Sequence, residues 1–194
     1  MEENTVGVPS TPRGTWVQVT EGRVFYPTDP QPREVYLKDI AQALSRQVRY
    51  NGLSDYFISV GQHSCQAAWM AEMEGYNAKV QLAMLMHDAP ETIIGDLIRP
   101  VKIQVPIFSV IEGKIMYAMN LGLDLPIIDH KLMKYFDNLC LAWEKRDMYP
   151  SALEWPMVPD VPFYCPKMTT WPMEYTERRF TKLFEYLRLE ILHG

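Results

Sequence analysis

Apolar residues recur every three or four positions through most of the chain after Glu34, and this periodicity constrains the fold more than any other feature of the sequence. Such spacing places apolar side chains on one face of an α-helix, and each such face must be buried against another element. The pattern predicts helices over about 34–50, 56–73, 78–87, 107–121, 128–147 and 173–192, with a short helical turn at 92–96. A chain of 194 residues can pack these helices around one core. We therefore expect an all-α fold, in which residues 34–194 form a single helical bundle.

Two segments lack this periodicity. Residues 1–33 form an N-terminal extension, in which two short β-like runs at 16–19 and 23–26 flank Glu21-Gly22 and suggest a small hairpin. Residues 150–172 carry six prolines, which is too many for regular structure, so we expect a packed surface loop or lid before the C-terminal helix.

Charge and composition narrow the class of protein. The net charge is −5 and no run of Lys or Arg stands out, which argues against a nucleic-acid polymer as partner. No apolar run approaches the roughly 20 residues that span a membrane, and the first residues lack the features of a signal peptide, so a cytoplasmic location is expected. The cysteines Cys65, Cys140 and Cys165 are odd in number and form no CxxC pair, which predicts buried thiols rather than disulfides or a Cys-rich zinc site.

Four polar residues occupy positions where a helical core is normally apolar: His63, His87, Asp88 and Asp137. Burying an imidazole or a carboxylate without a partner costs several kcal/mol, so several of them in one core imply mutual compensation or a bound cation. Each residue alone has an ordinary explanation, as a satisfied core histidine or a locally bonded aspartate. Together, two imidazoles and two carboxylates suit a divalent first-row metal with open positions for water and substrate.

The order of these residues, H…HD…D on successive helices, resembles that of the HD-domain phosphohydrolase superfamily, whose fold is all-helical. The segment HDAPETIIGDLIRPVK is similar to the signature shared by bacterial 5′-deoxynucleotidases and their phage relatives. Further segments resemble the phage branch, namely GTWVQV…GRVFYP, YLKDIAQALSRQVRYNG, FISVGQHS and DNLCLAWEKRDM. Together the similar segments cover most of residues 14–148.

The resemblance implies roles for residues at the reaction centre. The four polar residues would hold Zn, Co, Mn or Fe. Glu91 would position or deprotonate the attacking water, or protonate the leaving oxygen. Asp96 would orient Glu91, a water or the sugar hydroxyl. The alternatives from the residues alone remain open: Glu91 as a carboxylate at the positive end of a helix dipole, and Asp96 as a turn residue.

The resemblance also implies a substrate site. Lys102 and Lys134 match positions that contact phosphates in the phage relatives, and a second ion, Mg, can accompany those phosphates. Arg49 would contact phosphate and Tyr50 would pack against the nucleoside, where the relatives usually carry Trp, and Gly52 closes this binding segment. Solvated surface charge is the alternative for both lysines, and a helix-end Arg with a packing Tyr is the alternative for the other pair.

Two enzymatic functions follow, with a third candidate from another class. The first is a phage dATP triphosphohydrolase that releases deoxyadenosine and the phosphate chain, in the host cytoplasm, and the number of cations favours it. The second is a 5′-deoxynucleotidase that acts on deoxynucleoside monophosphates. The third is a non-catalytic nucleotide-binding HD module. A cyclic-dinucleotide phosphodiesterase is disfavoured because we find no second HD pair. Because relatives assemble as dimers or hexamers, a homo-oligomer is expected.

Overall fold

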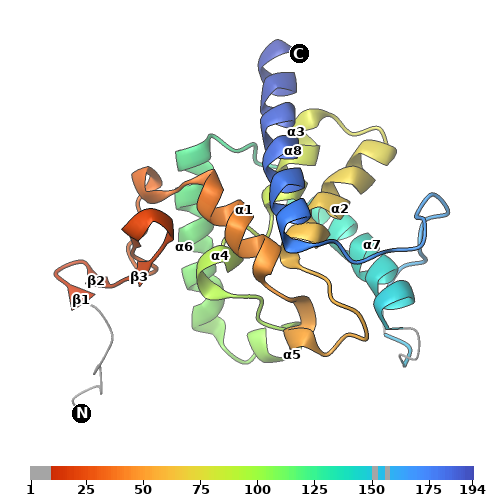
Figure 1. Ribbon diagram of the computed structural model, residues 1–194, viewed down its shortest axis with the longest axis horizontal. Helices are drawn as coiled ribbons and strands as arrows, with labels where there is room; N and C mark the ends of the chain where they lie inside the picture. The colour runs from red at the N-terminus through yellow and green to blue at the C-terminus, as the bar shows by residue number, and fades with distance from the viewer. Residues whose placement is uncertain (1–9, 150–152, 156–157) are drawn as a thin grey trace.

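The computed structural model describes residues 10–149, 153–155 and 158–194 and is mostly helical (Figure 1). This confirms the all-α fold class with a short β-containing extension at the N-terminal end. The helices of the described residues are α1 (Leu37–Arg46), α2 (Val60–Met73), α3 (Ala78–Met86), α4 (Glu91–Ile94), α5 (Arg99–Lys102), α6 (Pro106–Leu123), α7 (His130–Met148) and α8 (Met173–His193).

Helix α2 lies at the centre of the bundle and packs against α1, α3, α7 and α8. Its first turns are buried on all sides, from Val60 to Ala68, which explains why this segment is rich in small and uncharged residues. Helix α8 crosses the middle of the molecule in Figure 1 and packs against α1, α2 and α3. Helix α2 carries several fully buried polar side chains, and four other helices thus hold it in place.

Capping side chains fix where several helices begin. Ser59 accepts a hydrogen bond from the backbone of Gln62, so α2 starts at Val60 rather than near residue 56 as the periodicity suggested. Asn77 and Asp129 cap α3 and α7 in the same way. Helix α1 begins at Leu37 rather than at residue 34, because residues 32–34 form a separate 3₁₀ turn, η2 (Pro32–Glu34).

The prediction that the first helix continues through Tyr50 was wrong. Helix α1 ends at Arg46, and the chain then forms a 3₁₀ turn, η3 (Arg49–Gly52), in which Tyr50 and Asn51 have left-handed backbones with φ of 58° and 52°. The cause is a backbone pairing with the segment before α2: Arg49 N donates to Ile58 O and Val60 N donates to Gln47 O. These hydrogen bonds replace the next helical turn.

The N-terminal extension contains the predicted hairpin, in which β3 (Val17–Gln18) pairs antiparallel with β4 (Val24–Phe25). A second small pair, β1 (Ser10–Thr11) with β2 (Gly14–Thr15), precedes it. The buried carboxylate of Asp39 in α1 ties the hairpin to the bundle, because it accepts hydrogen bonds from the Thr20 backbone and from Arg23 Nη2, each at 3.1 Å. The extension is therefore part of the packed structure.

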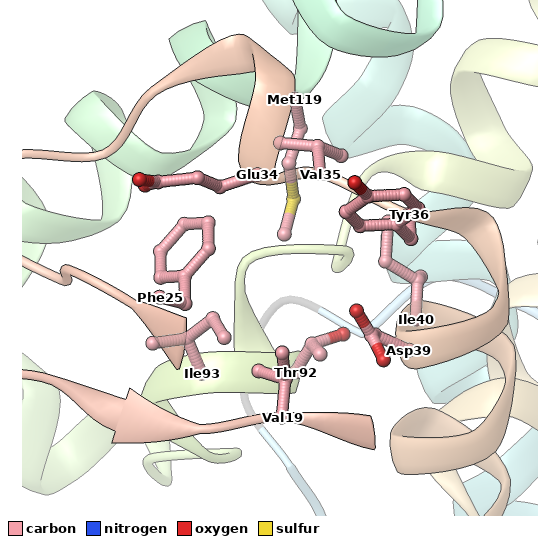
Figure 2. A pocket seen from close by; sticks show the side chains of 10 residues that line it. All are labelled: Val19, Phe25, Glu34, Val35, Tyr36, Asp39, Ile40, Thr92, Ile93 and Met119. Atoms are coloured by element: carbon pink, nitrogen blue, oxygen red, sulfur yellow. The ribbon is translucent and has the colours of Figure 1, made fainter. Parts of the chain in front are cut away.

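Between the hairpin and the bundle lies a small cavity (Figure 2). Phe25 from the hairpin, Ile93 from α4 and Met119 from α6 border it. Its volume of about 10 Å³ holds one water molecule at most, so it is too small for a nucleotide.

Residues 153–155 and 158–172 are irregular, as predicted for this proline-rich segment, whereas residues 150–152 and 156–157 fall outside the described residues. Cys65, Cys140 and Cys165 are buried free thiols, as the sequence indicated. Within the described part of the chain, no helix has both the length and the apolar character that crossing a membrane requires.

Candidate metal centre

Three helices bring two imidazoles and two carboxylates to one point. His63 comes from α2, His87 and Asp88 follow the last residue of α3, and Asp137 comes from α7. His63 Nε2 lies 3.3 Å from His87 Nε2, and 3.5 Å from both Asp88 Oδ2 and Asp137 Oδ1. His87 Nε2 lies 3.2 Å from Asp88 Oδ2 and 4.0 Å from Asp137 Oδ1. The four residues singled out in the sequence are thus neighbours in space.

These separations suit a common cation. Metal–ligand bonds to His N and carboxylate O are about 2.0–2.2 Å long, so donor atoms around one ion lie roughly 3.0–3.5 Å apart. The His63, His87 and Asp88 donors fall in this range, and Asp137 adjoins them at 3.5 Å from His63 and 4.0 Å from His87. This donor set fits Zn, Co, Mn or Fe and leaves coordination positions for other ligands.

Both histidines are oriented through their second ring nitrogen. His87 Nδ1 lies 2.7 Å from the carbonyl oxygen of Met84, to which it can only donate. His63 Nδ1 lies 2.7 Å from Oε1 of Glu144 in α7. With the proton on Nδ1, each ring directs its Nε2 lone pair toward the point where the four side chains meet. This tautomer is the one that a metal ligand requires.

Glu144 is a fully buried carboxylate with three partners. Besides His63, it accepts a hydrogen bond from Arg49 Nε at 3.1 Å and another from the Tyr50 hydroxyl. Burial alone would raise the pKa of Glu144, but the Arg49 and His63 charges and the hydrogen bonds hold that pKa below its ordinary value. Arg49 Nη1 also lies 3.6 Å from Asp88 Oδ2. The same guanidinium therefore contacts Asp88, which is a candidate ligand, and Glu144, which orients the candidate ligand His63.

The electrostatics of the cluster reflect its crowded carboxylates. Burial and Arg49 oppose a charge on His63, yet Glu144 and Asp137 raise the pKa of His63 to about 9. Burial likewise opposes ionisation of Asp88 and Asp137, but the two imidazoles hold the pKa of both carboxyls below the ordinary value. A positive charge at the centre of this cluster is therefore favoured, whether it comes from a proton or from a metal ion.

Glu91 lies beside the cluster, at the start of α4, with only 7% of its surface exposed. Burial and the carboxylates of Asp88 and Asp96 raise the pKa of Glu91 to about 10. The pKa of Asp96 is raised as well, mainly by burial. Glu91 Oε2 and Gln47 Oε1 are buried and have no hydrogen-bond partner among the described residues. Gln47 holds Glu91 in place, since its Nε2 donates to the Glu91 carbonyl at 2.7 Å. Glu91 thus offers a neutral carboxyl with an unused oxygen.

Two cations approach the outer oxygen of Asp137. Lys134 Nζ donates to Asp137 Oδ2 at 2.8 Å, and Arg99 Nη2 lies 3.6 Å from the same atom. The Arg99 and Lys134 side chains are 62% and 47% exposed, so a ligand can reach them. Lys102, the other lysine expected to contact phosphate, is engaged elsewhere, because its Nζ forms an ion pair with Glu112 of α6 at 2.6 Å.

Tyr50 joins an aromatic cluster next to Glu144. Its ring meets Tyr149 edge-on, with centroids 5.2 Å apart, and lies 6.1 Å from the Trp155 ring. Gly52, two residues further along η3, is exposed and has a left-handed backbone with φ of 74°. The structure thus places Arg49 and Tyr50 at the site, and Gly52 at the turn that ends the segment.

The sequence assigned no role to three residues of this site. Glu144 follows Asp137 by two helical turns and therefore lies on the same face of α7, a spacing that could have revealed it. Arg99 had no recognisable signal, because its role depends on the short helix α5, which the sequence did not predict. Gln47 reaches Glu91 only because α1 ends early.

Comparison with known proteins identifies relatives without assigning a function. No protein-family model matches the chain. It is 33% identical over 118 residues to an uncharacterized protein of Rhodobacter capsulatus, an alignment that covers 58% of this chain and 60% of the relative. It is 28% identical over 149 residues to the uncharacterized protein YfdR of Escherichia coli, covering 76% and 81% of the two chains. The chain thus spans less than two thirds of the first relative's length.

Replacing Glu144 tests whether it orients His63. In Glu144→Gln the charge that balances Arg49 is lost and the single amide oxygen cannot serve all three donors, so the affinity for Zn or Co should fall by about 10- to 100-fold. Competition with a coloured chelator measures this affinity, and Glu185→Gln, on the exposed side of α8, is the matched control. An affinity within twofold of the wild type would remove Glu144 from this role.

Burial of Glu91 makes a prediction about pH and stability. In the metal-free protein the folded state keeps Glu91 protonated up to a pKa of about 10, whereas the unfolded chain ionises near 4.5, so wild-type stability falls as the pH rises between these values. Glu91→Gln removes this loss. Its melting temperature should exceed that of the wild type by at least about 2 °C at pH 8, and the difference should widen from pH 5 to pH 9. Calorimetry in EDTA, with Glu185→Gln as control, measures it, and a constant difference across this range contradicts the prediction.

Proposed function

We propose that this chain is a metal-dependent phosphohydrolase of the HD-domain type that acts on a deoxynucleotide. The observation that carries the proposal is the meeting of four donor atoms, from His63, His87, Asp88 and Asp137, beside the unpartnered carboxyl of Glu91. A purely structural cluster would have no use for a buried carboxyl with an unused oxygen, since such a group destabilises the fold.

A divalent ion held by these donors supplies Lewis acidity toward a phosphoryl oxygen and lowers the pKa of a water molecule. The chain supplies the rest. Hydrolysis joins the water oxygen to phosphorus and breaks the bond between phosphorus and the 5′ oxygen of the sugar. That oxygen needs a proton as it leaves, and Glu91, whose pKa is raised, carries one at neutral pH. Asp96 lies close enough to influence Glu91 through its charge, which supports a role in orienting it.

The two cations at Asp137 support recognition of a phosphate chain. Asp137 presents Oδ1 to the histidines and Oδ2 to Arg99 and Lys134, so both cations lie on the outer side of the centre. Phosphates that extend outward from the reacting phosphorus would meet them. We therefore favour a deoxynucleoside triphosphate, dATP in particular, with deoxyadenosine and the phosphate chain as products and with a second Mg ion on the phosphates.

The aromatic cluster next to Glu144 supports binding of the nucleoside part of the substrate. Tyr50, Tyr149 and Trp155 surround the Glu144 network with partly exposed rings, a composition that suits stacking against a base or packing against deoxyribose. The guanidinium of Arg49 is engaged in ion pairs with Glu144 and Asp88, so its main contribution is the orientation of these groups. This assignment differs from the phosphate contact that the resemblance implies.

One observation favours the second candidate, a 5′-deoxynucleotidase. The ion pair with Glu112 engages Lys102, one of the two lysines expected to meet a triphosphate, whereas a single phosphate needs fewer cations. The non-catalytic HD module is the remaining alternative. Metal content and product analysis together separate all three.

Product analysis tests the proposal. The purified protein, with Zn, Co, Mn or Mg added in turn, should convert dATP to deoxyadenosine, as chromatography detects. His87→Ala and Asp137→Ala should each lower kcat by about 1,000-fold or more and lose the metal, because a ligand is missing. Turnover of deoxynucleoside monophosphates alone would select the nucleotidase. Activity above a few per cent in either variant would contradict the metal assignment, and silence with every substrate would favour the binding module.

Removing the outer cations should separate phosphate binding from chemistry. Arg99→Ala and Lys134→Ala should each raise KM for the triphosphate about tenfold, the equivalent of one charge-assisted hydrogen bond, with kcat and metal content nearly unchanged. Lys131→Ala is the matched control, since this exposed lysine lies one turn earlier on α7. Steady-state kinetics with metal analysis measures the effect. Equal KM values in the wild type and the three variants would show that Arg99 and Lys134 do not bind the substrate.

A further inference from the structure

Helix α6 is apolar in sequence but poorly buried. Among its 18 residues, PIFSVIEGKIMYAMNLGL, the charged ones are Glu112 and Lys114, and the buried ones are Ile115, Ala118 and Met119. It packs mainly against the neighbouring α5 and the turn η2 and stands away from α7 in Figure 1. An apolar helix that the described part of its own chain leaves uncovered usually meets another surface.

The uncovered residues of α6 form a continuous stripe. They follow one another at spacings of three, four, three and four residues, which is the spacing of the a and d positions of a coiled coil. The α6 stripe consists of Ile107 (61% exposed), Val110 (54%), Lys114, Tyr117 (67%) and Leu121 (56%). Ile103, just before the helix, extends it and is 68% exposed.

This stripe is complementary to an antiparallel copy of itself. Two α6 helices can pair about a two-fold axis that crosses them at the level of Glu112. Ile107 then faces Tyr117 of the partner subunit, and Ile103 faces Leu121 of the partner subunit. Lys114 then faces Val110 of the partner subunit with its methylene stem. Its ammonium group is directed aside, where Nζ lies 3.5 Å from the Thr28 carbonyl oxygen. A self-complementary pattern of this kind is what a two-fold interface requires.

A glycine on the flank of the stripe supports close approach. Gly113 lies in the middle of α6, where glycine is a poorer helix former than alanine. Nothing among the described residues lies within 4 Å of the position that a Cβ atom would take there, so packing within the chain does not explain this glycine. Together with Pro106 and Asn120 it forms an uncharged, compact flank against which a second helix can settle.

We propose that the α6 stripe is the two-fold interface of a homodimer. If a large apolar side chain carries roughly 150–200 Å² when fully exposed, the five apolar residues named above present on the order of 500 Å². Two such faces bury about 1,000 Å² together, the size at which specific interfaces begin. The exposed apolar residues of α8, by contrast, are interspersed with charges at Glu185, Arg188 and Glu190. The proposal does not depend on the enzymatic activity.

Sedimentation of the intact chain tests it. The wild type should sediment as an assembly of at least two 22.6-kDa chains at concentrations of about 1–100 μM, and Tyr117→Glu should halve the mass of that assembly. Tyr186→Glu is the matched control, because this half-exposed tyrosine of α8 lies outside the stripe. A monomeric wild type overturns the proposal, as does an assembly that withstands Tyr117→Glu or that Tyr186→Glu disrupts equally.

Gly113→Ala separates interface effects from folding effects. In an isolated chain this change should leave the melting temperature unchanged or raise it, because alanine favours the helix and meets no neighbour. Across a closely packed interface the same methyl group should raise the dimer dissociation constant by about tenfold. Circular dichroism checks the fold of each variant. A Gly113→Ala protein that dimerises as tightly as the wild type excludes the antiparallel arrangement given above.

Discussion

The carboxylate of Glu144 is the group on which the arrangement of the candidate metal centre depends. It has no contact with solvent, yet it accepts hydrogen bonds from His63, Arg49 and Tyr50, which come from two other segments of the chain. A buried charge is tolerated only when such partners compensate it, so the three groups are fixed together or not at all. Helix α7 thereby holds α2 and the turn η3 in register at the site.

The unusual backbone of η3 follows from the same requirement. Tyr50 has a left-handed conformation, which is uncommon for a bulky residue and costs of order 1 kcal/mol or more. The hydrogen bond from its hydroxyl to Glu144 and the packing of its ring against Tyr149 offset this cost. Glu144 thus links three features: the left-handed backbone of Tyr50, the buried guanidinium of Arg49 and the aromatic cluster.

The centre also concentrates groups that oppose folding. Glu91 is buried with an unused oxygen, and the carboxyl groups of Asp88 and Asp96 disfavour its ionisation. A fold selected for stability alone would replace such a group with an apolar or amide side chain. The first turns of the neighbouring helix α2, from Val60 to Ala68, are buried on all sides, and this packing sustains the arrangement despite its electrostatic cost.

The sequence by itself determined the helical class, the hairpin and the candidate ligands, because periodicity and misplaced polar residues are local signals. His63, His87, Asp88 and Asp137 stand out wherever their neighbours are apolar. Only the tertiary structure decided which groups support them. Three features depend on contacts between separate segments of the chain: the early end of α1, the ion pair of Lys102 with Glu112, and the approach of Arg99 to Asp137. Such contacts balance desolvation against pairing at separations of a few ångströms, and spacing along a chain carries no information about them.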